Sequence, residues 1–194
     1  MLEFLYETVL RVDYWLFLQI NNVWTHSILD NFFFWITDLH KTLYFKLIAI
    51  PLFIFLFIKK FKREGFSLFL MLLLTLGLND FIGGKVKRFV ERDRPEYNLS
   101  LSVIKRSDAG NYSFYSNHAA NMFAFATYVS QFLPQTRIPL YVIAGLVAYS
   151  RVYNGVHYPS DIFTGSIIGC FIGLLMSYFA KKVLSFLKSR RVEP

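Results

Sequence analysis

Five apolar runs limit what this chain can fold into more than any other feature of its sequence. They cover residues 42–58, 66–82, 118–133, 139–149 and 162–179. Several approach the length of about 20 apolar residues that a membrane-spanning helix needs. Inside a bilayer every backbone polar group must be bonded within the protein, which favours helices. The runs therefore predict an all-α polytopic membrane bundle of about five to six membrane helices.

Composition agrees with a membrane protein. Hydrophobic residues make up 55% of the chain, and 22 of its 194 residues are phenylalanine. The single cysteine, Cys170, excludes an internal disulfide. Residues 1–20 place charges among Leu, Phe, Tyr and Trp at helical spacing, which predicts an amphipathic helix lying in the interface. We expect one domain over residues 1–194, with N-terminal interfacial helices in 1–40 and a catalytic helical bundle in 41–185.

The positive charge of the chain points to membrane topology and lipid contacts. A net charge of +8 could reflect binding to nucleic acid. In a membrane protein, however, positive charge more often reflects contacts with anionic lipid headgroups and signals for membrane topology. Basic residues occupy 59–63, the turn at Arg137 and the C-terminal tail. Such segments mark the cytoplasmic side. We expect a cytoplasmic C-terminus, anionic headgroups as partners, no nucleic acid and no obligate protein partner.

A polar stretch from Ser150 to Asp161 lies between the last two apolar runs. Ionisable residues at such a place usually face a protein-lined cavity. Pro159 suits the first turn of a helix, so His157 should lie just outside the helix and Asp161 in its first turn. A carboxylate there can hold the imidazole in one tautomer. The pair indicates a working histidine; a purely structural pair is the alternative.

A basic segment precedes Pro95. We expect the helix of residues 66–82 to continue to about residue 93, before this proline. Lys87 and Arg94 would then share a helix face, about 10 Å apart along the axis. Two long cations on one face suit a tetrahedral anion. A solvated or headgroup-binding face is the alternative interpretation.

A third polar group, Tyr115–Ser116–Asn117–His118, opens an apolar run. Ser or Asn can cap that helix and leave its first N–H groups for an anion, although a plain cap beside an incidental histidine would look the same. Together with Arg151, these groups are what phosphoryl transfer without a metal requires. A metal site is the rival, since His-x-x-x-Asp has ligand-like spacing. The nearby cations and the missing third ligand argue against it, so we expect no cofactor.

The three segments resemble the signature motifs of a known family. Lys-x6-Arg-Pro, Ser-x-His and Ser-Arg-x5-His-x3-Asp follow one another between Lys87 and Asp161, as in the type 2 phosphatidic acid phosphatase superfamily of integral lipid phosphatases. The resemblance implies that His157 is the nucleophile and forms a phosphohistidine. It also implies that Asp161 orients His157 and that His118 is the general acid.

The resemblance further implies a set of phosphate ligands: Lys87, Arg94, Ser116 and Arg151, with the backbone N–H of Asn117 or His118 helping. The second motif departs from the family at one position, because Asn117 stands where the family usually has glycine. Asparagine tolerates a positive φ better than other non-glycine residues, so we expect the turn to survive.

The variant Ser-Asn-His-Ala-Ala-Asn at residues 116–121 resembles short bacterial members of the family. Those members include phosphatases of lipid A, undecaprenyl pyrophosphate and phosphatidylglycerophosphate. Extra cations near the motifs favour a headgroup with several negative charges; they are Lys85, Arg88, Arg92, Lys105 and Arg106. Nearby acidic residues offset this positive charge; they are Glu91, Asp93, Glu96 and Asp108.

We therefore expect a lipid A 1-phosphatase in a bacterial inner membrane, whose site faces the periplasm and whose substrate is a membrane lipid phosphate. Undecaprenyl pyrophosphate phosphatase and phosphatidylglycerophosphate phosphatase are the alternatives within the family. A transporter or flippase, which binds an anionic lipid without hydrolysing it, is the alternative from another class.

Overall fold

The computed structural model describes residues 2–39, 42–98, 100–110 and 112–189, and these residues form helices and loops with no strand. The all-α prediction is confirmed. The basic residues 190 and 191 of the C-terminal tail, which the sequence interpretation used, lie outside the described residues, as does His40. The α-helices are α1 (Leu2–Leu18), α2 (Ser27–Asp38), α3 (Ile50–Phe61), α4 (Arg63–Val90), α5 (Asn117–Ser130), α6 (Arg137–Tyr153) and α7 (Pro159–Ser189).

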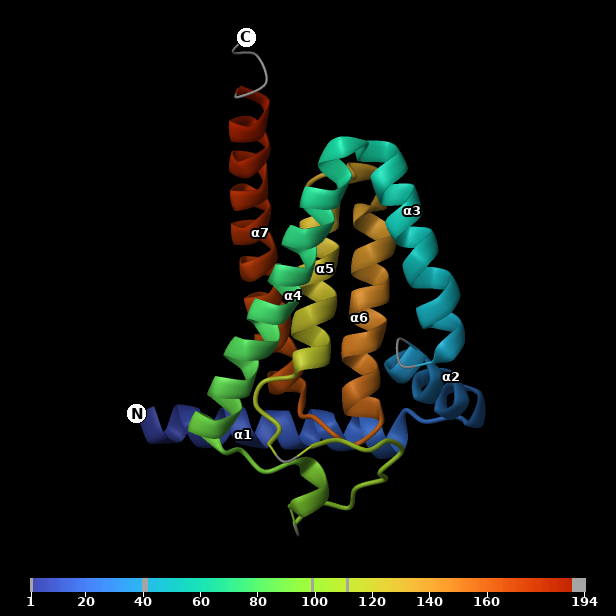
Figure 1. The fold of residues 1–194 in the computed structure, drawn as a ribbon. Helices are drawn as coiled ribbons and strands as arrows, with labels where there is room; N and C mark the ends of the chain where they lie inside the picture. Colours follow the sequence, from blue (N-terminus) through green and yellow to red (C-terminus); the bar gives the residue numbers. More distant parts are fainter. Residues whose placement is uncertain (1, 40–41, 99, 111, 190–194) are drawn as a thin grey trace.

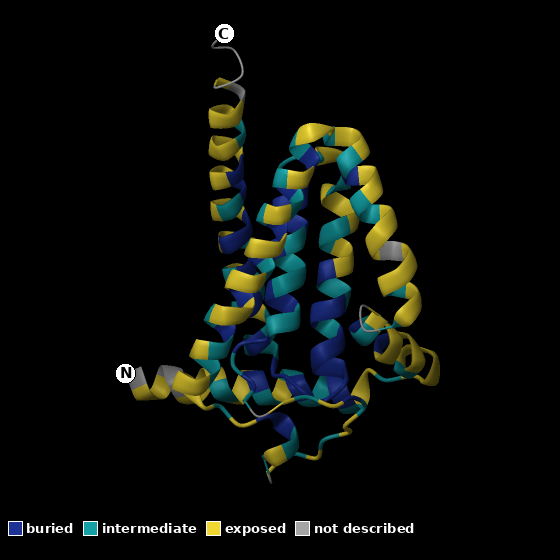
Figure 2. Cartoon of the chain, in the orientation of Figure 1, coloured by how far each residue is buried: buried dark blue, intermediate teal, exposed yellow. Residues whose placement is uncertain are grey.

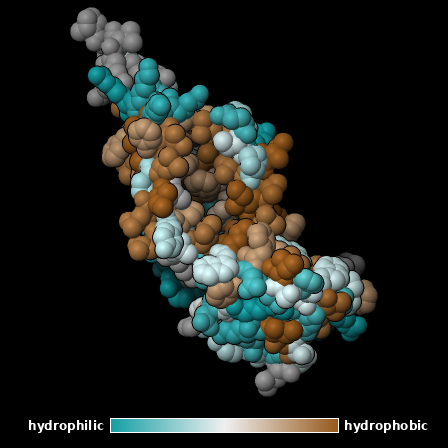
Figure 3. All heavy atoms as spheres, turned by 90° about the vertical axis from the view of Figure 1, so that its right-hand side faces the viewer, coloured by the Kyte–Doolittle hydropathy of each residue, from teal (hydrophilic) through white to brown (hydrophobic). Residues whose placement is uncertain are grey.

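Among the described residues, two helical segments are long and apolar enough to cross a membrane by themselves: Arg63–Tyr97, which contains α4, and Pro159–Leu187, within α7. The helices α5 and α6 have 14 and 17 residues, below the usual length of a span. Five to six membrane helices therefore remain a prediction. Figure 3 shows apolar residues gathered over the middle of the molecule, with hydrophilic residues towards its two ends.

The helices α4, α5, α6 and α7 stand side by side, and α1 lies across one end of them (Figure 1). This end is where α4 and α6 finish and where α5 and α7 begin. The exposed side chains of α1 include four large apolar ones, Phe4, Val9, Val12 and Trp15. A helix that crosses the bundle end with apolar side chains exposed fits the predicted interfacial position.

The closest packing in the bundle is between α5 and α7. A Cβ added at Gly165 would come within 2.6 Å of the carbonyl oxygen of Ser116, and one added at Gly169 would collide with the carbonyl of Ala120. Only glycine lets two helix backbones approach this closely. The seam therefore fixes how far apart the first turns of α5 and α7 lie.

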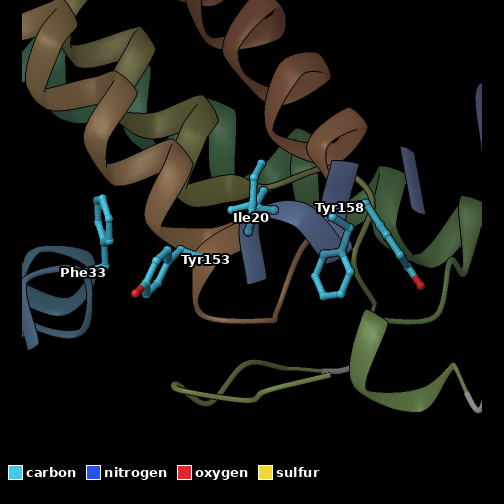
Figure 4. Close-up of a cluster of buried hydrophobic side chains, with 6 residues drawn as sticks. Ile20, Phe33, Tyr153 and Tyr158 are labelled. Carbon is cyan, nitrogen blue, oxygen red and sulfur yellow. The ribbon is translucent and has the colours of Figure 1, made fainter. Parts of the chain in front are cut away.

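One buried cluster lies at the end that α1 crosses, and another lies where α3, α4, α5 and α7 meet at the opposite end. Buried residues fill the lower half of α6 in Figure 2, whereas those of α5 are spread along the whole helix. The cluster beside α1 joins Ile20, Phe33, Tyr153 and Tyr158, which come from distant parts of the chain (Figure 4). Burying such apolar surface contributes about 25 cal/mol per Å². This cluster thus anchors α2 and the segment after α1 to the loop between α6 and α7.

Candidate active site

The structure brings the three predicted motifs together at one end of the bundle. The first motif lies at the end of α4 and in the loop that follows, and the second opens α5. The third covers the end of α6 and the start of α7. In Figure 1 these four helix ends meet above α1. Their arrangement follows from the up-and-down order of the helices. Because successive helices run in opposite directions, every second loop lies at the same end of the bundle.

His157 lies in the short connection between α6 and α7 and is 2% exposed. Its Nδ1 is 3.3 Å from Oδ2 of Asp161, and its Nε2 is 3.3 Å from Nη1 of Arg94. A guanidinium can only donate a hydrogen bond, so Nε2 of His157 carries the lone pair and Nδ1 donates to Asp161. The unprotonated nitrogen therefore faces the cation.

Burial lowers the pKa of His157 well below its usual 6.5, and the positive charges of Arg94, Arg151 and Lys87 lower it further. The imidazole is consequently neutral at physiological pH. A neutral imidazole with its lone pair directed at a cationic group is what attack on a bound phosphate requires.

Asp161 is fully buried in the first turn of α7 and accepts three hydrogen bonds. Besides His157, its donors are the backbone N–H of Tyr158 at 2.9 Å and Nη1 of Arg92 at 2.8 Å. These bonds fix the carboxylate on the Nδ1 side of His157. Asp161 is thus placed to hold the imidazole in a single orientation.

Lys87 and Arg94 both reach the site, but not from a shared helix face. The helix α4 ends at Val90, because Glu91 adopts a left-handed conformation with φ 51° and its N–H bonds to the carbonyl of Lys87. Arg94 lies beyond it in extended backbone. The prediction of a helix to residue 93 is therefore wrong, and with it the 10 Å spacing along one axis.

Backbone carbonyls hold these two cations in place instead. Nζ of Lys87 donates to the carbonyls of Tyr112 and Ser113 at 3.0 and 3.1 Å. Arg94 donates through Nε to the carbonyl of Gly110 and through Nη1 to that of Val156 at 2.5 Å. Because these carbonyls are neutral acceptors, they position both side chains without forming an ion pair, and the cations can attract an anion.

Arg151 is the third cation and is 2% exposed near the end of α6. Its Nη1 donates to Oγ1 of Thr37 on α2 at 2.7 Å. Its buried Nε has no hydrogen-bond partner among the described residues. A buried, unpaired donor is costly unless something binds to it, and an anion in the site would supply that partner.

Ser116 caps α5, since its Oγ accepts the N–H of Ala119 at 3.5 Å. Asn117 is the first residue of α5, and the only non-glycine residues with positive φ in the described part of the chain are Lys62 and Glu91. The turn therefore needs no left-handed residue at position 117. The Asn117 side chain donates to Asp80 on α4 at 3.1 Å, so only its backbone remains for a phosphate.

His118 lies in the first turn of α5, and its Nε2 is 3.8 Å from Oδ1 of Asp38 at the end of α2. Sequence reasoning assigned no role to Asp38 or to Thr37. Both belong to the N-terminal helices, which were expected only to lie in the interface. The structure instead brings the end of α2 against two of the predicted site residues, His118 and Arg151.

A network of ion pairs and hydrogen bonds next to Asp161 was also not predicted from the sequence. Arg92 bridges Asp161 and Asp13, donating to Asp161 at 2.8 Å and to Asp13 at 2.7 Å. Asp13 lies on α1 and is 5% exposed; it also accepts the backbone N–H and the Oγ–H of Ser160 at 2.8 and 2.6 Å. The guanidinium of Arg92 stacks on the ring of Tyr158, 3.9 Å from its centre. The helix α1 is thereby tied to the carboxylate that holds His157.

The residue types at the site fit an anion better than a divalent cation. In the described part of the chain, no group of three or more His, Cys, Asp or Glu residues is placed to share a metal ion. The side chains that converge near His157 are the cations Lys87, Arg94 and Arg151. Their charges would repel a metal and attract a phosphate.

Comparison with known proteins identifies the family. The PAP2 superfamily matches residues 66–184. The lipid A 4'-phosphatase of Porphyromonas gingivalis is 30% identical over 95% of this chain and 78% of that protein.

Two crystal structures have the same fold. Aquifex aeolicus LpxE has a TM-score of 0.69 and 30% identity, covering 85% of this chain and 94% of that one. The transmembrane PAP2 type phosphatidylglycerolphosphate phosphatase from Bacillus subtilis has a TM-score of 0.71 and 25% identity, covering 91% and 88%. The chain therefore belongs to the PAP2 superfamily, as a membrane hydrolase that acts on lipid phosphates.

Proposed function

We propose that this protein removes a phosphate from lipid A through a phosphohistidine intermediate on His157. The observation that carries the proposal is the placement of this imidazole. Its Nδ1 lies against the buried carboxylate of Asp161, and its Nε2 lies 3.3 Å from the guanidinium of Arg94. A phosphate held by Arg94 would lie next to the attacking nitrogen.

In the first step the Nε2 lone pair of His157 attacks phosphorus and the P–O bond to the lipid breaks. His118 gives a proton to the departing oxygen. The imidazole becomes positively charged as it is phosphorylated, and the carboxylate of Asp161 stabilises it. The cations Lys87, Arg94 and Arg151 stabilise the charge on the equatorial oxygens.

In the second step a water molecule attacks the phosphorus of phosphohistidine. His118, now unprotonated, takes a proton from that water, and the N–P bond breaks to release inorganic phosphate. Ser116 and the first N–H groups of α5 are further donors to the phosphate oxygens. The chemistry requires no metal, since cationic side chains supply the positive charge.

Similarity to lipid A 4'-phosphatase over 95% of the chain favours lipid A as the substrate and its 4'-phosphate as the group removed. The 1-phosphate, expected from the sequence, is the alternative on the same lipid. Phosphatidylglycerophosphate is the second candidate substrate, because the Bacillus subtilis structure covers 91% of the chain. Membership of a phosphatase family favours hydrolysis over lipid transport.

The distribution of charge supports a periplasmic site. The basic residues Lys59 and Lys60 end α3, Arg137 begins α6, and Lys181 and Lys182 lie near the end of α7. The end of α3, the start of α6 and the end of α7 lie away from the site (Figure 1). Basic segments stay in the cytoplasm. We therefore place the protein in the bacterial inner membrane with its C-terminus inside and its site outside.

The proposal is tested by phosphate release from lipid A, undecaprenyl pyrophosphate and phosphatidylglycerophosphate in detergent micelles. Mass spectrometry of the lipid A product reports which phosphate was lost. The variant His157→Ala should release almost none while remaining folded by thermal unfolding. Activity of this variant within a few-fold of wild type would refute the nucleophile assignment.

A further inference from the structure

A polar cavity lies beside the proposed general acid. It has a volume of about 510 Å³, and its lining comes from the last turns of α2 and from the loop before α5: Phe34, Asp38, Lys105, Arg106, Ser107 and Asp108. Asp38 belongs to this lining and also approaches Nε2 of His118 at 3.8 Å. The cavity and the acid are therefore neighbours. Its volume is sufficient for a small organic group.

The proposed reaction determines which part of a substrate this cavity would meet. A general acid must lie within hydrogen-bond reach of the oxygen that it protonates, and that oxygen belongs to the leaving group. If His118 is the acid, the leaving group lies on its side of the phosphate. The cavity next to His118 is thus where the leaving group continues, and this step rests on the proposed function.

The cavity is polar but its cations are already neutralised. Lys105 pairs with Glu96 at 2.7 Å and with Asp108 at 3.2 Å. Arg106 pairs with Asp30 at 2.8 Å and stacks on Tyr153, 4.7 Å from the ring centre. A second phosphate would need uncancelled cations, as Lys87 and Arg94 provide at the catalytic end. The extra positive charge that the sequence placed here is therefore not available to a diphosphate headgroup.

The other groups suit hydroxyls and a ring. Ser107 is 8% exposed, and its Oγ has no hydrogen-bond partner among the described residues. A buried hydroxyl of this kind is expected to bond to a ligand or to water. The carboxylates of Asp38 and Asp108 are further acceptors for hydroxyl donors. Phe34 is 48% exposed and offers an aromatic face of the kind that can pack against a sugar ring.

We infer that this cavity binds the sugar of the leaving group, a hexose or hexosamine ring that carries the scissile phosphate. Ser107 and the two carboxylates bond to ring hydroxyls, and Phe34 packs against the ring. The cavity thereby selects glycolipid phosphates over lipids whose leaving group is a glycerol or another phosphate. The catalytic end recognises phosphate alone, and this cavity recognises what the phosphate is attached to.

The test compares two substrates in each variant. The measured quantity is the ratio of kcat/KM for lipid A to kcat/KM for p-nitrophenyl phosphate, which has no sugar. This ratio should fall about three- to tenfold in Ser107→Ala and in Phe34→Ala, as expected for the loss of one hydrogen bond or ring contact. Trp35→Ala is the matched control. The ring centres of Trp35 and Phe34 are 5.8 Å apart, but Trp35 does not line the cavity.

Three results would count against the inference. It is wrong if both variants keep the ratio within twofold of wild type, or if Trp35→Ala lowers it equally. Either result leaves the proposed function standing, provided that wild type hydrolyses lipid A. If wild type releases phosphate from undecaprenyl pyrophosphate but not from lipid A, the proposed substrate is wrong and so is the assignment of the cavity to a sugar.

Discussion

Replacing Asp13 with Asn tests whether α1 helps to position the nucleophile. The carboxylate of Asp13 accepts one hydrogen bond from Arg92 and two from Ser160, all between 2.6 and 2.8 Å. Asparagine has one acceptor oxygen and an amide that donates, so one or two of these bonds are lost. Each hydrogen bond to a charged group contributes about 1.5–3 kcal/mol.

The expected loss of stability is therefore about 1.5–6 kcal/mol, and the lower end is appropriate because Arg92 is 18% exposed. The larger effect is expected on the rate. Arg92 without Asp13 no longer has a fixed position on Asp161, and a displacement of about 1 Å near reacting groups can cost up to about 100-fold. We expect kcat to fall about 10- to 100-fold. KM should change little, because none of the phosphate ligands is altered.

The assay is phosphate release from lipid A in micelles, with thermal unfolding to establish that each variant is folded. Glu7→Gln is the matched control, since it makes the same carboxylate-to-amide change at an exposed position of α1. A folded Asp13→Asn protein with kcat within twofold of wild type would refute the role of α1. An equal loss in Glu7→Gln would show a general effect of charge on this helix.

Four further outcomes are expected. His118→Ala should reduce hydrolysis of lipid A far more than that of p-nitrophenyl phosphate, whose leaving group scarcely needs a proton; equal reduction in steady-state rates would refute the acid role. Burial, followed by the charge of Arg94, lowers the pKa of His157, so the unfolded chain takes up a proton below pH 6.5 that the folded chain does not. The melting temperature should fall as pH drops from 6.5 towards the folded-state pKa, and His157→Gln should weaken that dependence. Activity should survive EDTA and be inhibited by vanadate, whereas loss of activity in EDTA that added Mg²⁺ restores would overturn the mechanism. Asn117→Gly should keep activity within about threefold but melt at a lower temperature, because it removes the bond to Asp80 and places glycine at a helix start.

The parts of the site that sequence could predict are those with short-range signals. Pro159 marks the start of α7, so His157 and Asp161 could be placed beside one another, and Ser116 could be identified as a cap. The up-and-down order of apolar helices then brings the motifs to one end. Each of these inferences depends on residues a few positions apart or on the alternation of helix direction.

The parts that sequence could not predict depend on long-range contacts or on local backbone choices. Glu91 ends α4 in a left-handed conformation that is uncommon for a non-glycine residue. No local sequence pattern therefore predicted that the helix would end there. The bond from Ser160 to Asp13 joins residues 147 positions apart. The sequence set Glu96 among the acids that offset Lys105 and Arg106, but Asp30 becomes the partner of Arg106 only once α2 is folded against the loop.

The glycine seam between α5 and α7 has a consequence for how such a protein can diversify. Because Gly165 and Gly169 allow no side chain, the two helix starts that bear the acid and the nucleophile keep one separation whatever changes around them. Variation is left to residues 105–108 of the loop before α5 and to α2, which lie outside this seam. New substrates can then arise by exchanging residues in those segments while the distance between the reacting groups is inherited unchanged.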